Sequence, residues 1–196
     1  MNKENQNILI NKPDVHWDQI IRPEVSLLNI DFGEIWRYRT LLQMYVKRDI
    51  VTFYKQTILG PLWFFIQPLF TTLIFMVIFG KLAGISTNGL PQGLFYMAGI
   101  ICWNYFSDSL TRTSSTFKEN QHVFGKVYFP RIVVPMSIVI ANLVRFGIQF
   151  LLFGMFYFYY IFKGVNVHPN SGVLLFPVLI VIIAGLSLGF GMIISA

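Results

Sequence analysis

The chain is 196 residues long, and 55% of its residues are hydrophobic whereas only 12% are charged. Soluble domains carry about 25% charged residues, so this composition does not supply a water-facing surface. The 17% of aromatic residues excludes a disordered chain. Cys102 is the only cysteine, which excludes a small secreted fold held together by internal disulfides. A polytopic membrane protein is the class that remains.

The net charge of +6 is unevenly distributed along the chain. Most of the 15 Lys and Arg residues lie within residues 1–60 and 111–131, beside apolar runs. That distribution is typical of the charges that orient a protein in a membrane. Nucleic-acid binding requires a basic face on a folded soluble domain, so we expect no nucleic-acid partner.

The amino-terminal part of the chain is predicted to lie in the cytoplasm and on the membrane surface. Residues 1–30 are polar and contain no apolar core of signal-peptide length, so we expect a cytoplasmic amino terminus. In residues 31–60 a helix is expected to begin at the capping box formed by Asp31 and Glu34. One side of this helix collects Ile35, Tyr38, Leu42, Tyr45 and Val46. The pattern fits equally an amphipathic helix in the headgroup layer and one packed on protein.

Residues 61–196 contain four apolar runs that we interpret as membrane-spanning helices, which makes the predicted fold all-α. The runs cover about residues 62–80, 93–116, 132–162 and 173–196. The first run carries no charge and would be about 28 Å long as a helix, close to the thickness of a hydrocarbon core. The third would be about 46 Å long, so it must tilt, protrude or break, with Gly147 and Gly154 as weak points.

The loops between these runs predict the orientation of the chain. Basic residues are concentrated before the first run (Lys47, Arg48, Lys55) and in the loop 117–131 (Lys118, Lys126, Arg131). The other two loops carry Lys81 and Lys163 alone, so the loop 117–131 is expected in the cytoplasm. No basic flank or polar tail follows the fourth run, which is typical of a piece of a longer protein.

We find no constellation for catalysis or metal binding in the sequence. His16, His122 and His168 lie in three different segments, and none has a neighbour at ligand spacing. The phosphate-binding pattern GxxxxGK[ST] does not occur, so any ATP hydrolysis belongs to another chain.

Charged residues inside the apolar runs are the first candidate functional feature. Arg145 lies within the third run, where a charge costs at least a few kcal/mol unless it faces protein or water. The favoured interpretation is a structural partner for a carboxylate or a helix carbonyl, and the other is a contact for an anionic substrate. Asp108 and Arg112 are four residues apart on one helix face and are predicted to pair.

Aromatic residues are the second candidate feature. The loop 117–131 interleaves aromatic and charged side chains, which suits either a surface gripped by a protein partner or an interfacial anchor. Trp63 and Trp103 belong to a larger set of aromatic residues in the apolar runs. We expect most of that set to face lipid and a minority to line a passage.

Two segments taken together resemble the membrane subunit of ABC-2 type exporters, in the branch that exports O-antigen, capsule or teichoic acid. One is residues 44–68, MYVKRDIVTFYKQTILGPLWFFIQP, and the other is residues 117–131, which end in KVYFPR. Either segment alone would be a weak signal. The resemblance covers nearly all of the chain after about residue 30.

The resemblance implies an interface helix at about residues 31–56, six membrane spans of which four are visible here, and a coupling helix at about Lys118–Tyr128. It implies two permeases with two ATPase subunits in a bacterial inner membrane, with the passage where the permeases meet. The substrate would be a glycan on an undecaprenyl diphosphate carrier or a teichoic acid, and the chain itself would bind no cofactor. ATPase docking is expected at Lys118, Glu119, Asn120, Val123, Phe124, Lys126 and Tyr128. The interface helix would use Trp36, Arg39, Arg48, Asp49, Tyr54 and Lys55, and the translocation path Trp63, Trp103 and Arg145.

Three other functions remain open from the sequence. A permease of the same fold could carry a smaller amphiphile such as a drug or a lipid. A membrane-embedded transferase of envelope synthesis would need convergent acid, base or metal groups, for which Asp108 with Arg112 is the one acid-containing pair in the spans. A membrane scaffold that transports nothing is the third.

Overall fold

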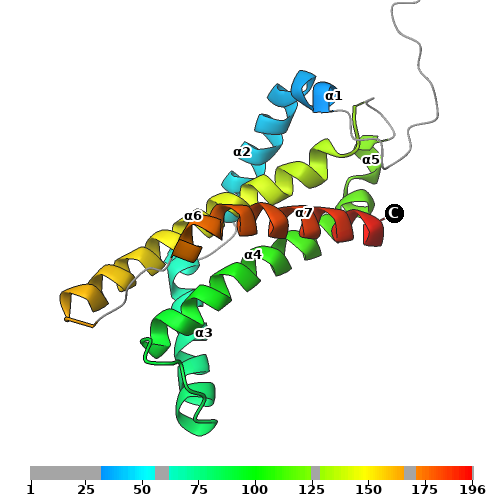
Figure 1. Cartoon of the computed structure of the whole chain (residues 1–196). Coiled ribbons are helices and arrows are strands. Elements are labelled where there is room, and N and C mark those ends of the chain that lie inside the picture. Colours follow the sequence, from blue (N-terminus) through cyan, green and yellow to red (C-terminus); the bar gives the residue numbers. More distant parts are fainter. Residues whose placement is uncertain (1–31, 56–61, 125–128, 166–170, 196) are drawn as a thin grey trace, which may run out of the picture. The chain divides into compact units, whose positions relative to one another are not determined.

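The computed structural model describes residues 32–55, 62–124, 129–165 and 171–195, and the regular structure in these ranges is helical (Figure 1). In chain order the helices are α1 (Phe32–Arg37), α2 (Arg39–Lys55), α3 (Trp63–Phe75), the π-helix η3 (Met76–Leu82), α4 (Gln92–Glu119), α5 (Gln121–Phe124), α6 (Val133–Phe162), the 3₁₀-helix η4 (Ser171–Leu175) and α7 (Phe176–Ser195). The all-α prediction is therefore confirmed for these ranges. The predicted cytoplasmic segment 1–30 lies outside them.

Three helical segments among the described residues are long and apolar enough to cross a membrane. They are Trp63–Leu82, Val133–Phe162 and Ser171–Ser195, and they coincide with the first, third and fourth predicted spans. At the place of the second predicted span stands α4, which has 28 residues. It is long enough to cross, but Asp108 and Arg112 make it less apolar, so its crossing stays a prediction. The chain has the architecture of a polytopic membrane protein.

The longest helix, α6, is continuous. It runs through 30 residues from Val133 to Phe162, a length of about 45 Å. Of the three alternatives left open for this run, which were tilt, protrusion and a break at Gly147 or Gly154, the break does not occur, because each glycine weakens a helix by only about 1 kcal/mol and the apolar flanks outweigh that penalty. Pro135 is tolerated because it lies in the first turn, where its missing N–H would have had no helical partner.

The carboxyl-terminal end of α3 widens into η3 before the chain returns as α4. The N–H of Ala83 donates to the carbonyl of Ile78 at 2.9 Å, a bond that spans five residues. Within the return, Asn88 and Gly89 have φ of 51° and 83°. Two successive left-handed residues make a tight reversal, and asparagine and glycine are the residues that tolerate this conformation best.

The core lies where α4 packs along α6 and α7. Its buried members are Met97, Ile101, Tyr105, Val139 and Phe146. The approach of α7 to α4 is especially close at Gly191, where an added Cβ would lie 2.6 Å from the Cβ of Thr113. Small residues allow membrane helices to approach in this way, and the resulting van der Waals contacts hold the helices together.

The amino-terminal helix differs from the prediction in one respect, since a turn at Tyr38 divides it into α1 and α2. Its apolar side packs on protein. Tyr38, Leu41, Leu42 and Tyr45 lie against a cluster formed by Phe129, Val133 and Val134. Packing on protein is thus the arrangement of this side of the helix. Placement of the opposite side in the lipid headgroups stays a prediction.

Candidate functional site

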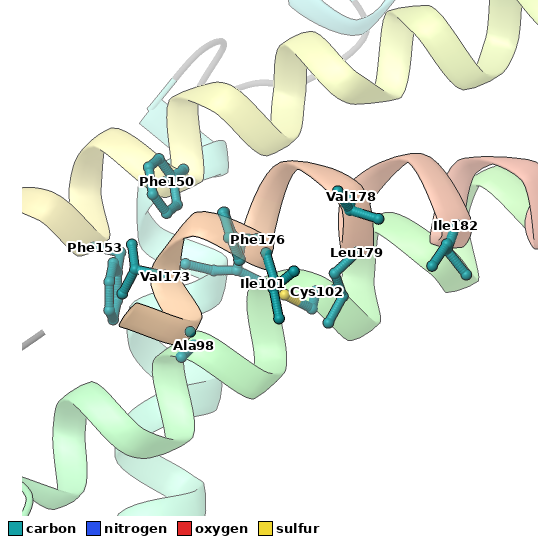
Figure 2. Close-up of a pocket in the computed structure, with 12 residues that line it drawn as sticks. Ala98, Ile101, Cys102, Phe150, Phe153, Val173, Phe176, Val178, Leu179 and Ile182 are labelled. Carbon is teal, nitrogen blue, oxygen red and sulfur yellow. The ribbon is translucent and has the colours of Figure 1, made fainter. Parts of the chain in front are cut away.

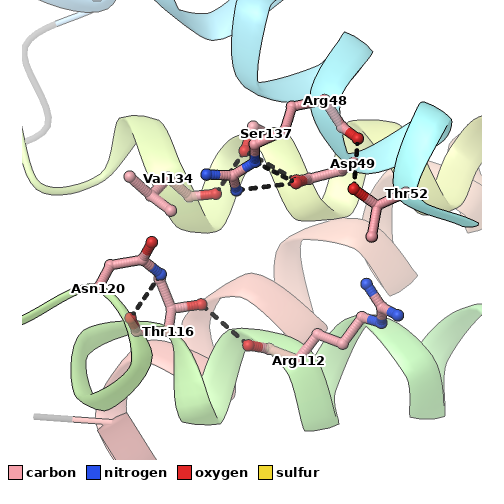
Figure 3. A network of polar contacts seen from close by, with 8 residues as sticks. All are labelled: Arg48, Asp49, Thr52, Arg112, Thr116, Asn120, Val134 and Ser137. Atoms are coloured by element: carbon pink, nitrogen blue, oxygen red, sulfur yellow. Dashed lines mark hydrogen bonds and ion pairs between the residues drawn. The ribbon is translucent and has the colours of Figure 1, made fainter. Parts of the chain in front are cut away.

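A polar cluster joins α2 to α6 at the Arg48–Asp49 pair that the sequence singled out. Asp49 Oδ1 accepts hydrogen bonds from Arg48 Nε at 2.9 Å and from Arg48 Nη2 at 2.8 Å (Figure 3). Ser137 Oγ of α6 lies 3.5 Å from Asp49 Oδ2 and also donates to the carbonyl of Val134 at 2.8 Å. Because the hydroxyl has a single hydrogen, the shorter bond to Val134 dominates. Asp49 is buried against α6, and Arg48 neutralises its charge.

Two further arginines meet at the ring of Phe53, which α2 supplies. The guanidinium carbon of Arg112, from α4, lies 4.1 Å from the ring centroid, and that of Arg145, from α6, lies 5.1 Å from it. Arg145 also lies 4.9 Å from the ring centroid of Phe64. Both rings are buried, whereas Arg112 is exposed and Arg145 is partly buried.

The predicted pairing of Asp108 with Arg112 is wrong. Asp108 Oδ2 instead forms an ion pair with Arg145 Nη1 at 2.9 Å, which links α4 to α6. The structure therefore gives Arg145 the carboxylate partner of its favoured interpretation. The ion pair between α4 and α6 forms in place of the pair within α4, because Arg112 contacts the Phe53 ring instead of Asp108.

Close to Asp108 and Arg145, α4 and α6 also share several buried polar side chains. Asn142 donates from Nδ2 to the hydroxyl of Ser109 at 3.1 Å. Asn142 Oδ1, Thr113 Oγ1 and Arg145 Nε are buried without a hydrogen-bond partner among the described residues. Each such unsatisfied group costs about 1–3 kcal/mol. The interface between α4 and α6 is therefore more polar than helix packing alone would need.

Within the expected coupling segment, the described residues belong to two helices. Lys118 and Glu119 form the exposed last turn of α4, Asn120 ends that helix, and the four residues of α5 follow. Asn120 Nδ2 donates to the carbonyl of Thr116 at 2.9 Å (Figure 3) and so closes the helix end. Val123 and Phe124 belong to α5, whereas Lys126 and Tyr128 lie outside the described residues.

The same end of α4 is tied to the end of α7. The backbone N–H of Phe117 donates to Ser195 Oγ at 3.2 Å, although the two residues lie far apart in the sequence. No sequence pattern indicated this contact, because a lone serine at the end of an apolar run carries no partner signal.

Most of the predicted interface-helix residues whose side chains are described are exposed on α1 and α2, whereas Asp49 is buried. Trp36 is 70% exposed, and the guanidinium of Arg39 lies 5.5 Å from the centroid of its ring. Arg48 lies 4.5 Å from the ring centroid of Tyr45. Lys55 is exposed at the end of α2, and Tyr54 is part of that helix. Aromatic rings beside cations are typical of side chains at a membrane–water boundary.

The residues predicted for the translocation path differ in their exposure on the single chain. Trp63 and Trp103 are 42% and 66% exposed, whereas Arg145 is held inside the bundle by Asp108. None of the three lines the cavity of about 800 Å³ between α4, α6 and α7 (Figure 2). That cavity is apolar, and its walls include Phe150, whose ring stacks on Phe176 at 5.1 Å between centroids.

The described residues contain no group of three or more His, Cys, Asp or Glu side chains placed to hold a metal ion.

Comparison with known proteins places the chain in a family. The model of the ABC-2 type transporter family matches residues 40–196. The chain is 31% identical over 153 residues to the O-antigen export system permease protein RfbA of Myxococcus xanthus, a match that covers 76% of this chain and 55% of that protein. It is 30% identical over 111 residues to an RfbA protein of Klebsiella pneumoniae, covering 57% of this chain and 40% of that one. The chain spans about half the length of these relatives, and it belongs to the ABC-2 type transporter family.

Proposed function

We propose that the chain is the membrane-spanning permease part of an ATP-driven exporter that moves a lipid-linked polysaccharide of O-antigen type across a bacterial inner membrane. The observation that carries the proposal is the family match, which runs from α2 through α7. The relatives named for O-antigen export support the choice of substrate. The long apolar helices supply the membrane-crossing part of such a machine.

A passage through protein is needed because a glycan does not cross hydrocarbon unaided. Each hydroxyl buried without a partner costs about 1–3 kcal/mol, and a polymer carries many of them. Trp63 and Trp103 are exposed on a single chain and would be covered where a second copy meets it. Flat rings there would stack on sugar faces without holding any one sugar tightly.

The driving force would come from a separate ATPase subunit that docks at the end of α4 and on α5. Lys118 and Glu119 are exposed there, and α4 continues without a break from that end to Gln92. A helix of this kind transmits a push along its axis, because every backbone hydrogen bond inside it resists bending. In this scheme the amino terminus and the loop 117–131 face the cytoplasm.

Co-purification of the ATPase tests the docking surface. The full permease is expressed with its ATPase as wild type, as Lys118→Glu and as Phe124→Ala, and we expect less ATPase to be recovered with each variant. Lys163→Glu makes the same charge change in the loop expected on the outer face and serves as the control. Unchanged recovery for both docking variants would remove the proposed docking surface.

Glycan export tests the substrate. Cells that lack the permease should retain polysaccharide inside, where an external lectin does not reach it, and the wild-type permease should restore surface labelling. A strain that displays normal surface glycan without the permease would refute polysaccharide export and would favour a smaller amphiphile as the substrate.

A further inference from the structure

Polar residues recur in pairs along α4 at a spacing of four residues. The first pair is Asn104–Tyr105, the second is Asp108–Ser109 and the third is Arg112–Thr113. Four residues make about one helical turn, so the three pairs lie one after another along the same side of α4. We call this series the polar ladder of α4.

The helix α6 contacts the second pair of the ladder. Arg145 Nη1 forms its ion pair with Asp108 Oδ2 at 2.9 Å, and Asn142 Nδ2 donates to Ser109 Oγ at 3.1 Å. Further buried polar atoms of the two helices have no hydrogen-bond partner among the described residues: Asn104 Nδ2, Tyr105 Oη, Thr113 Oγ1 and Asn142 Oδ1. The first and third pairs thus carry polar groups that the present contacts leave unused.

The contacts between α4 and α6 also fix the relative direction of the two helices. Ser109 contacts Asn142, and one turn earlier along α4 the ring centroid of Tyr105 lies 5.4 Å from that of Phe146, one turn later along α6. The two helices are therefore antiparallel. A movement of α6 by one turn toward the start of α4 at Gln92 would take each α6 side chain from one pair of the ladder to the preceding pair.

We infer that α6 has two stable positions along α4, the described one and one shifted by a helical turn, about 5.4 Å, toward the start of α4. In the shifted position the first pair of the ladder replaces the second. Arg145 then donates to the amide oxygen of Asn104, and the hydroxyl of Tyr105 donates to Asn142 Oδ1. The hydrogen bond that Asn142 loses at Ser109 is replaced by this one, so both positions satisfy the side chain of Asn142.

The shift leaves the carboxylate of Asp108 with a cationic partner. Arg112 lies four residues after Asp108 on the same side of α4, and the two groups already attract each other. Once Arg145 has moved away, Arg112 pairs with Asp108 and leaves the ring of Phe53. Arg145 keeps that ring as its neighbour, because Phe53 packs with Ala141 of α6 and moves with this helix.

The movement is favourable in one direction along the ladder. The opposite movement would bring Arg145 to the third pair, beside Arg112, and the two guanidinium groups repel each other. In the permitted direction lies the apolar cavity of about 800 Å³, whose α4 wall reaches Cys102, just before the first pair (Figure 2). Phe150 and Phe153 of α6 line this cavity, so the rings of the moving helix have space in front of them.

Pulsed electron paramagnetic resonance on the full permease in detergent tests the two positions. Nitroxide labels are attached in a Cys102→Ala background, and the labelled protein is diluted with unlabelled protein so that distances within one chain are measured. One label pair is Thr111→Cys in α4 with Leu151→Cys in α6, and the other is Phe95→Cys with Leu143→Cys, all at exposed positions. The shift moves α6 away from Thr111 and toward Phe95, so the first distance lengthens and the second shortens, each by about 5 Å.

Exchanging the carboxylate between the first two pairs should drive the shift. The variant Asn104→Asp with Asp108→Asn offers Arg145 its carboxylate one turn earlier, so we expect the shifted distances to dominate, whereas wild type shows mainly the described position. Asn88→Asp makes the same change in the loop before α4 and should leave both distances unchanged. Unchanged distances in an exchanged variant that unfolds at the wild-type temperature would overturn the proposal. Distances that only broaden, without opposite shifts, indicate a loosened bundle and would overturn it as well.

A second variant tests the shift without moving a charge. Ser109→Ala removes the hydrogen bond that holds Asn142 at the second pair, so the share of the shifted distances should rise about fivefold, the effect of one lost hydrogen bond. Adding Tyr105→Phe removes the partner of Asn142 in the shifted position and should reverse this gain.

The second variant also decides the question if the exchanged variant does not fold. No gain in Ser109→Ala, or a gain that Tyr105→Phe leaves intact, overturns the proposal. The measurement uses neither ATPase nor glycan, so its failure is distinguishable from failure of the proposed docking or export.

Discussion

Replacing Gly191 with alanine is expected to force α7 away from α4. The new methyl carbon would stand 2.6 Å from both Cβ and Cγ2 of Thr113 and 3.4 Å from the carbonyl oxygen of Leu110. Carbon atoms in contact lie about 3.5–4.0 Å apart, so the helices must separate by roughly 1 Å or Thr113 must shift. Overpacking of this kind costs about 1–3 kcal/mol, against which the better helix propensity of alanine returns about 0.5–1 kcal/mol.

The control for this change is Gly185→Ala in the same helix. A Cβ at Gly185 meets nothing within 4 Å, so this variant gains the helix propensity without a clash. We expect thermal unfolding in one detergent to show Gly191→Ala less stable than wild type and Gly185→Ala equal or more stable. A Gly191→Ala protein as stable as the Gly185→Ala protein would refute close packing of α7 on α4 at this point.

Three further outcomes follow from burial and charge. Met97→Ala removes a side chain that is 1% exposed and should destabilise the fold by about 2–5 kcal/mol in thermal unfolding, whereas Met155→Ala, at a position 69% exposed, should have little effect. Asp49→Asn should loosen α2 from α6 and speed amide hydrogen exchange along α2, and Thr52→Val on the same helix should not. In a permease that keeps Trp103 as its one tryptophan, brominated lipids should quench the fluorescence of the monomer more than that of the dimer, because a second copy would cover the ring; equal quenching in both would place that ring in lipid.

The positions of the long helices could be predicted from the sequence because a span is a local property. An uncharged run such as residues 62–80 is bounded by glycine and proline, so its length and its ends are both visible in the chain. Three of the predicted spans reappear as helices of suitable length and composition. The apolar side of the amino-terminal helix was visible for the same reason, since its side chains recur at helical spacing.

The partners of the charged side chains could not be predicted in this way. Spacing along α4 brings Asp108 and Arg112 onto one face, but the register of α6 against α4 decides that Asp108 meets Arg145. Phe53, which ties these charges together, looked like one aromatic residue among many. Helical periodicity identifies the buried face of a helix, whereas the neighbour that covers the face depends on contacts distant in the sequence.

The ring of Phe53 has a mechanical consequence for the whole chain. It stands edge-on to Phe64 of α3 at 6.4 Å between centroids, while α4 and α6 hold it through their arginines. Through this one side chain, α2 contacts α3, α4 and α6. A small tilt of α2 would therefore displace α3, α4 and α6 together, because all three contact the Phe53 ring.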